Sequence, residues 1–160
     1  MEKKLSEQTK SRLTKAGWLL FYFYLILLSY FLFFSEHYGR GSISEEYRYN
    51  LELFKEIKRF IKYREILGIE NFIVNILGNV LAFTPFGFFL PCLKKKYRRF
   101  ILVAFLSILF SLMIESLQLY SKVGIFDVDD ILMNSIGGML GYMAFKVVYF
   151  VLQRFHNVNR

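Results

Sequence analysis

Long uncharged apolar runs restrict the folds open to this chain of 160 residues. The first run, from Gly17 to Phe34, reads GWLLFYFYLILLSYFLFF and contains no charged residue. About 18 apolar residues are enough to cross the hydrocarbon core of a bilayer as a helix, whereas a water-soluble domain rarely contains such a run. The sequence therefore predicts an integral membrane protein.

Three further apolar runs follow the first one. The first run is longer than the ~7–15 residues of a signal-peptide core, and no A-x-A-like cleavage site follows it, so we expect an uncleaved helix. Together the runs predict membrane spans at about 17–34, 72–93, 100–119 and 130–153. The predicted fold is an all-α integral membrane protein, with a four-helix membrane domain over residues 17–153 between tails at 1–16 and 154–160.

The segment 35–70, between the first two predicted spans, is polar. It carries seven basic and seven acidic residues, so its net charge is zero. Apolar residues recur in it at spacings of three and four: Tyr47, Leu51, Phe54, Ile57, Phe60 and Ile61. This spacing predicts an amphipathic helix, and such a helix beside two spans is typical of the membrane interface.

Basic residues gather on one side of the predicted membrane topology. Residues 1–16 carry five of them, the loop 94–99 carries five in six positions, and the C-terminal tail carries two. The other two loops have no such excess. Because Lys and Arg accumulate in cytoplasmic loops, we expect both termini in the cytoplasm and the amphipathic segment outside. The same pattern accounts for the net charge of +8 without a nucleic-acid partner.

Polar residues in the last three predicted spans fall at one depth. At ~1.5 Å per residue they lie within roughly 10–15 Å of the outer surface, and spacings of three or four residues place each pair on one helix face. An ionisable group in a span is costly and usually faces the bundle interior. We therefore predict a polar cluster with Asp127 and Asp129 at its rim, built from Asn75, Asn79, Glu115, Gln118, Asp130 and Asn134.

Simpler roles are open for the same residues. Asn and Gln side chains often link membrane helices, Glu115 can extend to the headgroups, and Asp129 and Asp130 can cap the fourth span. Helix packing or a helix kink is predicted for four further residues: Pro85, Gly87, Gly137 and Gly141. None of these roles alone explains why the polar groups gather at one depth.

Three motifs stand in order on successive predicted spans. They are N-x-x-x-N-x-x-x-F-x-P-x-G over 75–87, E-x-x-Q over 115–118, and F-D-x-D-D with N-x-x-G-x-x-x-G over 126–141. With these motifs, residues 50–145 resemble the VanZ-like family of small bacterial membrane proteins. Two positions depart from the family pattern: Gly124-Ile125 stands where many members have an Arg, and residues 50–54 lack the proline of N-L-x-P-F.

The resemblance implies a protein of the bacterial plasma membrane that lowers susceptibility to teicoplanin-type glycopeptide antibiotics. Its implied partners are the lipid bilayer and either the antibiotic or a lipid-linked cell-wall precursor.

Two alternatives stay open. One is an intramembrane enzyme acting on a lipid or lipid-linked precursor, with Glu115, Asp129 and Asp130 as candidate catalytic residues that hold a divalent metal or transfer protons. The other is a small carrier or flippase, which would need to form a homo-oligomer. The chain has no complete catalytic motif, no zinc-ligand spacing and no P-loop. A non-enzymatic factor is therefore favoured, and neither a metal nor a cofactor is assigned.

Overall fold

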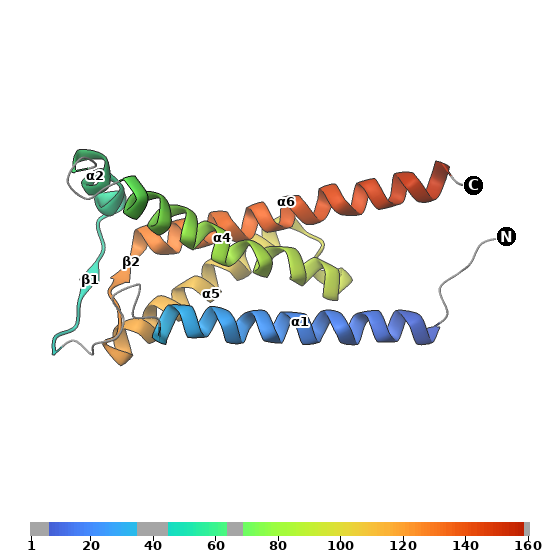
Figure 1. The fold of residues 1–160 in the computed structure, drawn as a ribbon, viewed down its shortest axis with the longest axis horizontal. Helices are drawn as coiled ribbons and strands as arrows, with labels where there is room; N and C mark the ends of the chain where they lie inside the picture. The colour runs from blue at the N-terminus through green and yellow to red at the C-terminus, as the bar shows by residue number, and fades with distance from the viewer. Residues whose placement is uncertain (1–6, 35–44, 64–68, 159–160) are drawn as a thin grey trace.

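Four long helices run along the molecule in a computed structural model that describes residues 7–34, 45–63 and 69–158. They are α1 (Glu7–Phe34), α4 (Ile69–Leu93), α5 (Phe100–Ser121) and α6 (Val128–Val158). The start of α1 and the end of α6 lie at one end of the bundle (Figure 1). At the other end lie the short helix α2 (Lys55–Lys62) and the strands β1 (Tyr49–Asn50) and β2 (Phe126–Asp127).

Each long helix contains a stretch that is long and apolar enough to cross a membrane. These stretches are Ser11–Phe34, Ile76–Leu93, Phe100–Ser121 and Val128–Phe155. The predicted all-α bundle of four membrane helices is therefore confirmed. The helices α1 and α6 extend beyond the predicted spans, to Glu7 and Val158, because polar residues such as Gln, Lys and Arg favour helix as well as apolar ones do.

The amphipathic segment contains a helix, but it is shorter than the residue spacing predicted. Tyr47 and Leu51 lie before α2, and residues 49–50 form β1. This strand pairs in parallel with β2, in a register that places Tyr49 opposite Phe126. Phe54, just before α2, has a left-handed backbone with φ 64°, so the chain turns sharply there. Local periodicity could not predict β1, because its partner β2 follows it in the chain only after the spans of α4 and α5.

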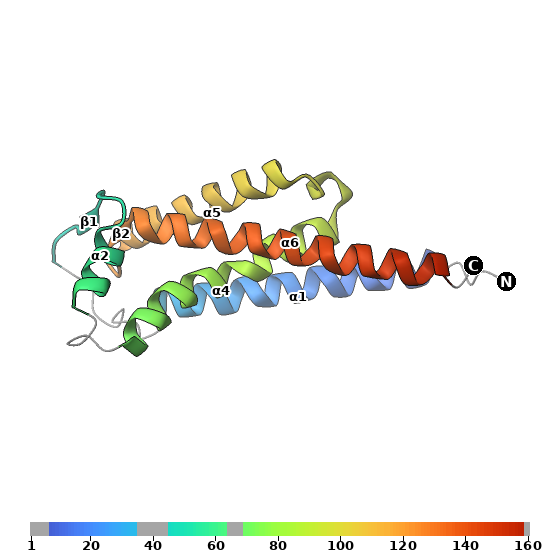
Figure 2. The same ribbon diagram turned by 90° about the horizontal axis from the view of Figure 1, so that it is seen from above.

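The helices α4 and α6 form the central contact of the bundle. Figure 2 shows α6 against both α4 and α5, with α1 beside α4. A Cβ on Gly141 would overlap the Thr84 carbonyl, and a Cβ on Gly137 would overlap that of Val80. A Cβ on Gly87 would likewise overlap the carbonyl of Gly138. The two backbones therefore approach where side chains are missing.

Two prolines, Pro85 and Pro91, lie within α4, which the structure draws as one helix over Ile69–Leu93. A kink at Pro85 stays a prediction. One apolar cluster lies toward the end where α1 begins, and there the rings of Phe86 and Phe110 stack with centroids 4.5 Å apart. A second one, of Leu28, Phe83 and Ile114, borders the polar residues. The buried polar residues lie mostly toward the other end, so the bundle interior has an apolar part and a polar part.

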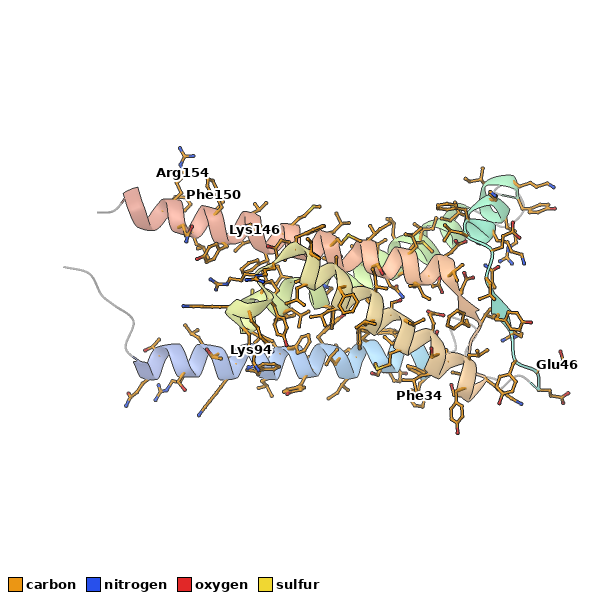
Figure 3. The ribbon with its side chains drawn as sticks, turned by 180° about the vertical axis from the view of Figure 1, so that it is seen from behind. Phe34, Glu46, Lys94, Lys146, Phe150 and Arg154 are labelled. Atoms are coloured by element: carbon orange, nitrogen blue, oxygen red, sulfur yellow. The ribbon has the colours of Figure 1, made fainter. Side chains whose placement is uncertain are left out.

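Basic residues without acidic neighbours lie toward the end of the bundle where α1 begins, whereas the basic residues of α2 at the other end belong to a segment with as many acidic residues. Figure 3 shows Lys94, Lys146 and Arg154 on that side, and Phe34 and Glu46 on the opposite side. The Lys94 ammonium lies 5.5 Å from the Trp18 ring centroid. Aromatic rings with cations beside them are typical of a membrane–water interface. The loop 94–99 therefore lies toward the same end of the bundle as the start of α1 and the end of α6, beside Trp18 and Tyr149.

Candidate functional site

The polar residues of the predicted cluster gather around the start of α6. Seven polar side chains are buried there, inside an otherwise apolar bundle: Asn50, Ser111, Glu115, Gln118, Asp127, Asp129 and Asn134. We call these seven residues, together with the half-buried pair Asn79 and Asp130, the polar cluster. The side chain of Asn75, which the sequence also places there, lies outside the described part of the chain.

Two acidic residues in the first turn of α6 bind different parts of the fold. The Asn79 amide of α4 donates a hydrogen bond to Asp130, with Nδ2 and Oδ1 2.6 Å apart. The backbone N–H of Phe54 donates to Oδ1 of Asp129. Acidic residues are also favourable at this position because the helix N-terminus carries partial positive charge. These carboxylates therefore fasten α4 and the turn before α2 to α6.

Asp127 joins the two strands to α6. Its Oδ1 accepts hydrogen bonds from Asn50 Nδ2, at 3.1 Å, and from the backbone N–H of Asp129, at 2.8 Å. The second bond makes Asp127 the N-cap of α6, because the helix begins at Val128, two residues earlier than predicted. The sequence analysis left this role open for Asp129 and Asp130. Burial raises the pKa of Asp127, although these two hydrogen bonds oppose the rise.

Glu115 brings α5 into the same network. Its Oε2 accepts a hydrogen bond from the backbone N–H of Asp127, with a distance of 3.1 Å. A buried carboxylate is costly unless donors surround it, so this bond helps to compensate for the burial of Glu115. The motifs on three helices thus meet through direct hydrogen bonds around residues 127–130.

Gln118 and Asn134 each use one half of the side-chain amide. Gln118 Nε2 donates to the carbonyl of Leu32 on α1, at 3.0 Å, and Asn134 Nδ2 donates to the hydroxyl of Ser111 on α5, at 2.9 Å. Their carbonyl oxygens are buried and accept no hydrogen bond from the described residues. Such oxygens are the acceptors that water or a polar ligand group satisfies in membrane bundles.

Sequence reasoning missed two members of the cluster. Ser111 lies one helical turn before Glu115, so the i,i+4 rule used for the other pairs could have found it. No residue spacing pointed to Asn50 as a member of the cluster, because the segment around it was interpreted as an amphipathic helix. Its place next to Asp127 depends on the pairing of β1 with β2.

The chemistry of the cluster is hydrogen bonding between acids and amides. Among residues 7–34, 45–63 and 69–158, no three Asp, Glu, His or Cys side chains are grouped so that they could hold a metal ion. The carboxylates of Asp127, Asp129 and Asp130 instead accept hydrogen bonds from protein N–H groups. The arrangement can hold the strands and α2 firmly over one end of the bundle.

A groove opens beside the cluster, between α1 and α4. Its volume is about 440 Å³, and Asn79 forms part of its wall. We call it the α1–α4 groove. It is lined by Tyr24, Leu27, Leu28, Phe31 and Leu32 of α1, and by Gly78, Asn79, Leu81, Ala82 and Pro85 of α4.

Comparison with protein families matches residues 21–150 to the VanZ/LLP1 family. The chain belongs to the VanZ/LLP1 family. The match contains all three motifs, so the resemblance inferred from the sequence is confirmed. Comparisons with curated proteins and with solved structures found no match.

The structure gives the VanZ/LLP1 motifs of this chain a common location. Each of the three motif segments contributes at least one hydrogen bond to the network around residues 127–130. The missing proline of the N-L-x-P-F pattern falls at Leu53, beside the left-handed Phe54. Lys122, two residues before Gly124, donates to the Glu45 carbonyl at 2.9 Å and so joins the end of α5 to the segment before β1.

Proposed function

We propose that this VanZ/LLP1 protein acts at the outer face of a bacterial plasma membrane and lowers susceptibility to teicoplanin-type glycopeptide antibiotics. The observation that carries the proposal is the position of the basic loop 94–99, which has no acidic residue, away from the polar cluster along the bundle. Lys94 of this loop, Lys146 and Arg154 lie toward the end where α1 begins. The cluster lies toward the end with β1, β2 and α2, where basic residues are matched by acidic ones in the same segment.

The positive-inside rule turns this separation into an orientation. Lys and Arg of short loops stay in the cytoplasm, so the loop 94–99 and both termini are cytoplasmic in this proposal. The strands, α2 and the polar cluster then face outward, where cell-wall precursors and glycopeptides meet. Exposed aromatic and apolar residues of this end, including Tyr49, Leu51 and Phe54, suit a surface that lies in the headgroup region.

A binding or shielding role fits the cluster better than catalysis. Its carboxylates accept hydrogen bonds that fasten one element to another, and a residue used in this way is constrained in its position. The cluster joins residues of five elements, β1, α4, α5, β2 and α6, at the end of the bundle that faces outward in this proposal. An end of this kind suits a protein that changes how a lipophilic antibiotic or its lipid-linked target is presented.

The orientation is tested by labelling single cysteines in intact cells. Cys92 is first replaced by Ser, and Glu46→Cys and Lys95→Cys are then made separately, since both positions are exposed. A membrane-impermeant maleimide is expected to label position 46 in intact cells and position 95 only after the cells are opened. Labelling of position 95 in intact cells contradicts the proposed orientation.

The activity is tested by expressing the full chain in a teicoplanin-susceptible Gram-positive host. We expect the inhibitory concentration of teicoplanin to rise, together with a change in the binding of labelled teicoplanin to the cell surface. Unchanged susceptibility and unchanged binding at verified expression contradict the proposal. Turnover of a polyprenyl or phospholipid substrate by the purified protein would favour the enzymatic alternative instead.

A further inference from the structure

Arg98 of the loop 94–99 is held in a fixed position on α6. Its guanidinium carbon lies 4.7 Å from the ring centroid of Tyr149 and 5.6 Å from that of Phe145, one turn away on the same helix. Its Nε donates to the carbonyl of Pro91 at 3.3 Å. The N–H groups of its two terminal nitrogens have no acceptor among the described residues, and such a pair can bind a phosphate in two parallel hydrogen bonds. Arg98 is therefore oriented, with donors left for an outside anion.

Lys146 places a second cation on the same face of α6. It follows Tyr142 by four residues and precedes Tyr149 by three, so the three side chains share one face. The Tyr142 hydroxyl donates to the carbonyl of Arg98 at 2.9 Å, so this face is the one that meets the loop. Lys146 is exposed, and Figure 3 shows it toward the same end of the bundle as Lys94. Like charges at one level of the bundle repel each other, and a bound anion relieves that repulsion.

Acidic side chains do not neutralise this surface. The loop 94–99 contains five basic residues and no acidic one. Glu7 of α1 lies eleven residues before Trp18, roughly 16 Å along the helix, which exceeds the Debye length of about 8 Å at physiological ionic strength. The described acidic residues of the other three long helices lie in the halves toward the opposite end: Glu70, Glu115, Asp129 and Asp130. The positive charge is therefore left for a partner to neutralise.

The depth of the loop indicates which anion it meets. Figures 1 and 2 show α1 and α6 extending past the connection between α4 and α5. The apolar stretch of α1 begins at Ser11, seven residues before Trp18. That of α6 ends at Phe155, six residues after Tyr149. The cations beside these two rings thus lie roughly 9–11 Å inside the ends of the neighbouring apolar stretches. The headgroup layer on each side of the hydrocarbon core is only about 5–8 Å thick, so the loop lies within that layer.

A lipid phosphate fits this position better than a soluble anion or an acidic protein. Phosphates of the surrounding lipids lie at the same depth, whereas a soluble partner must reach past the ends of α1 and α6. Basic clusters beside membrane helices bind anionic headgroups, and each cation contributes to the attraction. The rings of Trp18, Tyr97 and Tyr149 beside the cations are typical of the headgroup layer.

We propose that the loop 94–99, together with Lys146 of α6, binds the headgroup of an anionic glycerophospholipid of the adjoining leaflet. Arg98 holds the phosphate in two hydrogen bonds, and Lys146 and the lysines of the loop add attraction by charge. This proposal does not depend on the antibiotic activity or on the side of the membrane that the loop faces.

The test uses the fluorescence of Trp18, the single tryptophan of the chain. The full chain is reconstituted in vesicles of phosphatidylcholine and phosphatidylglycerol at a fixed ratio. Bromine atoms, which quench tryptophan on contact, are placed near the headgroup end of the acyl chains of one lipid or of an equal amount of the other. Two further reporters carry Trp18→Phe: one adds Tyr149→Trp beside Arg98, and the other adds Tyr120→Trp at the far end of α5.

Brominated phosphatidylglycerol is expected to quench more strongly than brominated phosphatidylcholine in the wild type and in the Tyr149→Trp reporter. In that reporter, Arg98→Gln and Lys146→Gln should each lower the relative association constant of phosphatidylglycerol by as much as roughly fivefold at low salt. Lys146→Gln leaves the contacts of Arg98 intact, so it serves if Arg98→Gln does not fold. Lys62→Gln removes an exposed charge of α2 at the other end of the bundle and should leave the preference unchanged.

Three results would overturn the proposal. The first is equal quenching by the two brominated lipids at position 149, or a preference there that survives both substitutions. The second is an equally large preference in the Tyr120→Trp reporter, because anionic lipid would then surround the whole bundle. The third is loss of the preference in inorganic phosphate but not in chloride of the same ionic strength, since the cations would then bind a soluble anion.

Discussion

Replacing Gly141 by Ala tests the central contact between α4 and α6. The new Cβ would overlap the carbonyl of Thr84 and come close to the backbone nitrogen of Phe88. Both are backbone atoms of a packed helix, so they cannot move aside as a flexible side chain can. Overpacking of this kind costs about 1–3 kcal/mol of the free energy of unfolding.

Gly78→Ala is the matched control for this substitution. It makes the same change within a membrane helix, but its Cβ meets open space. Without strain, a Gly→Ala change stabilises by about 0.4–1 kcal/mol, because it reduces the conformational freedom of the unfolded chain. That gain is common to both substitutions, so their difference isolates the overlap with α4.

The assay is reversible unfolding in mixed micelles, with the denaturing detergent titrated against the folded protein. Gly141→Ala is expected to be less stable than Gly78→Ala by about 1–3 kcal/mol. Equal stability of the two variants, or a more stable Gly141→Ala, would refute the packing of α6 on α4 described here. Both variants should keep the helical circular-dichroism signal at low detergent fraction.

Three more predictions concern the polar cluster. Burial raises the pKa of Asp127, so the folded protein keeps this proton at pH values where the unfolded chain has released it. The free energy of unfolding of the wild type, relative to that of Asp127→Asn, should therefore fall as pH rises from about 4 through the raised pKa of Asp127, and stay level above it. A wild-type advantage that grows with pH contradicts this prediction. Ser111→Ala removes the acceptor of the Asn134 amide and should lower the free energy of unfolding by about 1–3 kcal/mol, measured in the same micelles, whereas no loss would argue against that hydrogen bond. Asp129→Ala should speed proteolytic cleavage near Phe54, because the Phe54 N–H loses its acceptor. Asp129→Asn keeps an oxygen at that position, so this variant should be cleaved more slowly than Asp129→Ala; equal cleavage rates of the two variants would refute the bond between Phe54 and Asp129.

The sequence was sufficient to predict the bundle because a membrane span is a local property. A run such as Gly17–Phe34 needs no distant partner to be recognised, since length and the absence of charge decide it. Spacing along one helix likewise brought Glu115 and Gln118 to a common face. The membrane spans and the residues on one face of a single helix could therefore be predicted from hydropathy and periodicity.

The connections between elements were not accessible in this way. Asn50 reaches Asp127 through a strand pair of two residues on each side, which local periodicity does not show. The acids of the F-D-x-D-D motif lie together at the start of α6, but the separate partners of Asp129 and Asp130 depend on how the turn before α2 and α4 pack. The α1–α4 groove depends on the distance between two apolar helices, and hydropathy carries no information about that distance.

The most direct test of the proposed function measures teicoplanin susceptibility and membrane abundance together for cluster variants. Glu115→Gln, Asp130→Asn and Asn79→Ala change the cluster, and Leu109→Ala changes an exposed residue of α5 as the control. The account predicts that the cluster variants lose the protective effect at normal abundance, whereas the control keeps it. Full protection by cluster variants at normal abundance would contradict a functional role for the polar cluster.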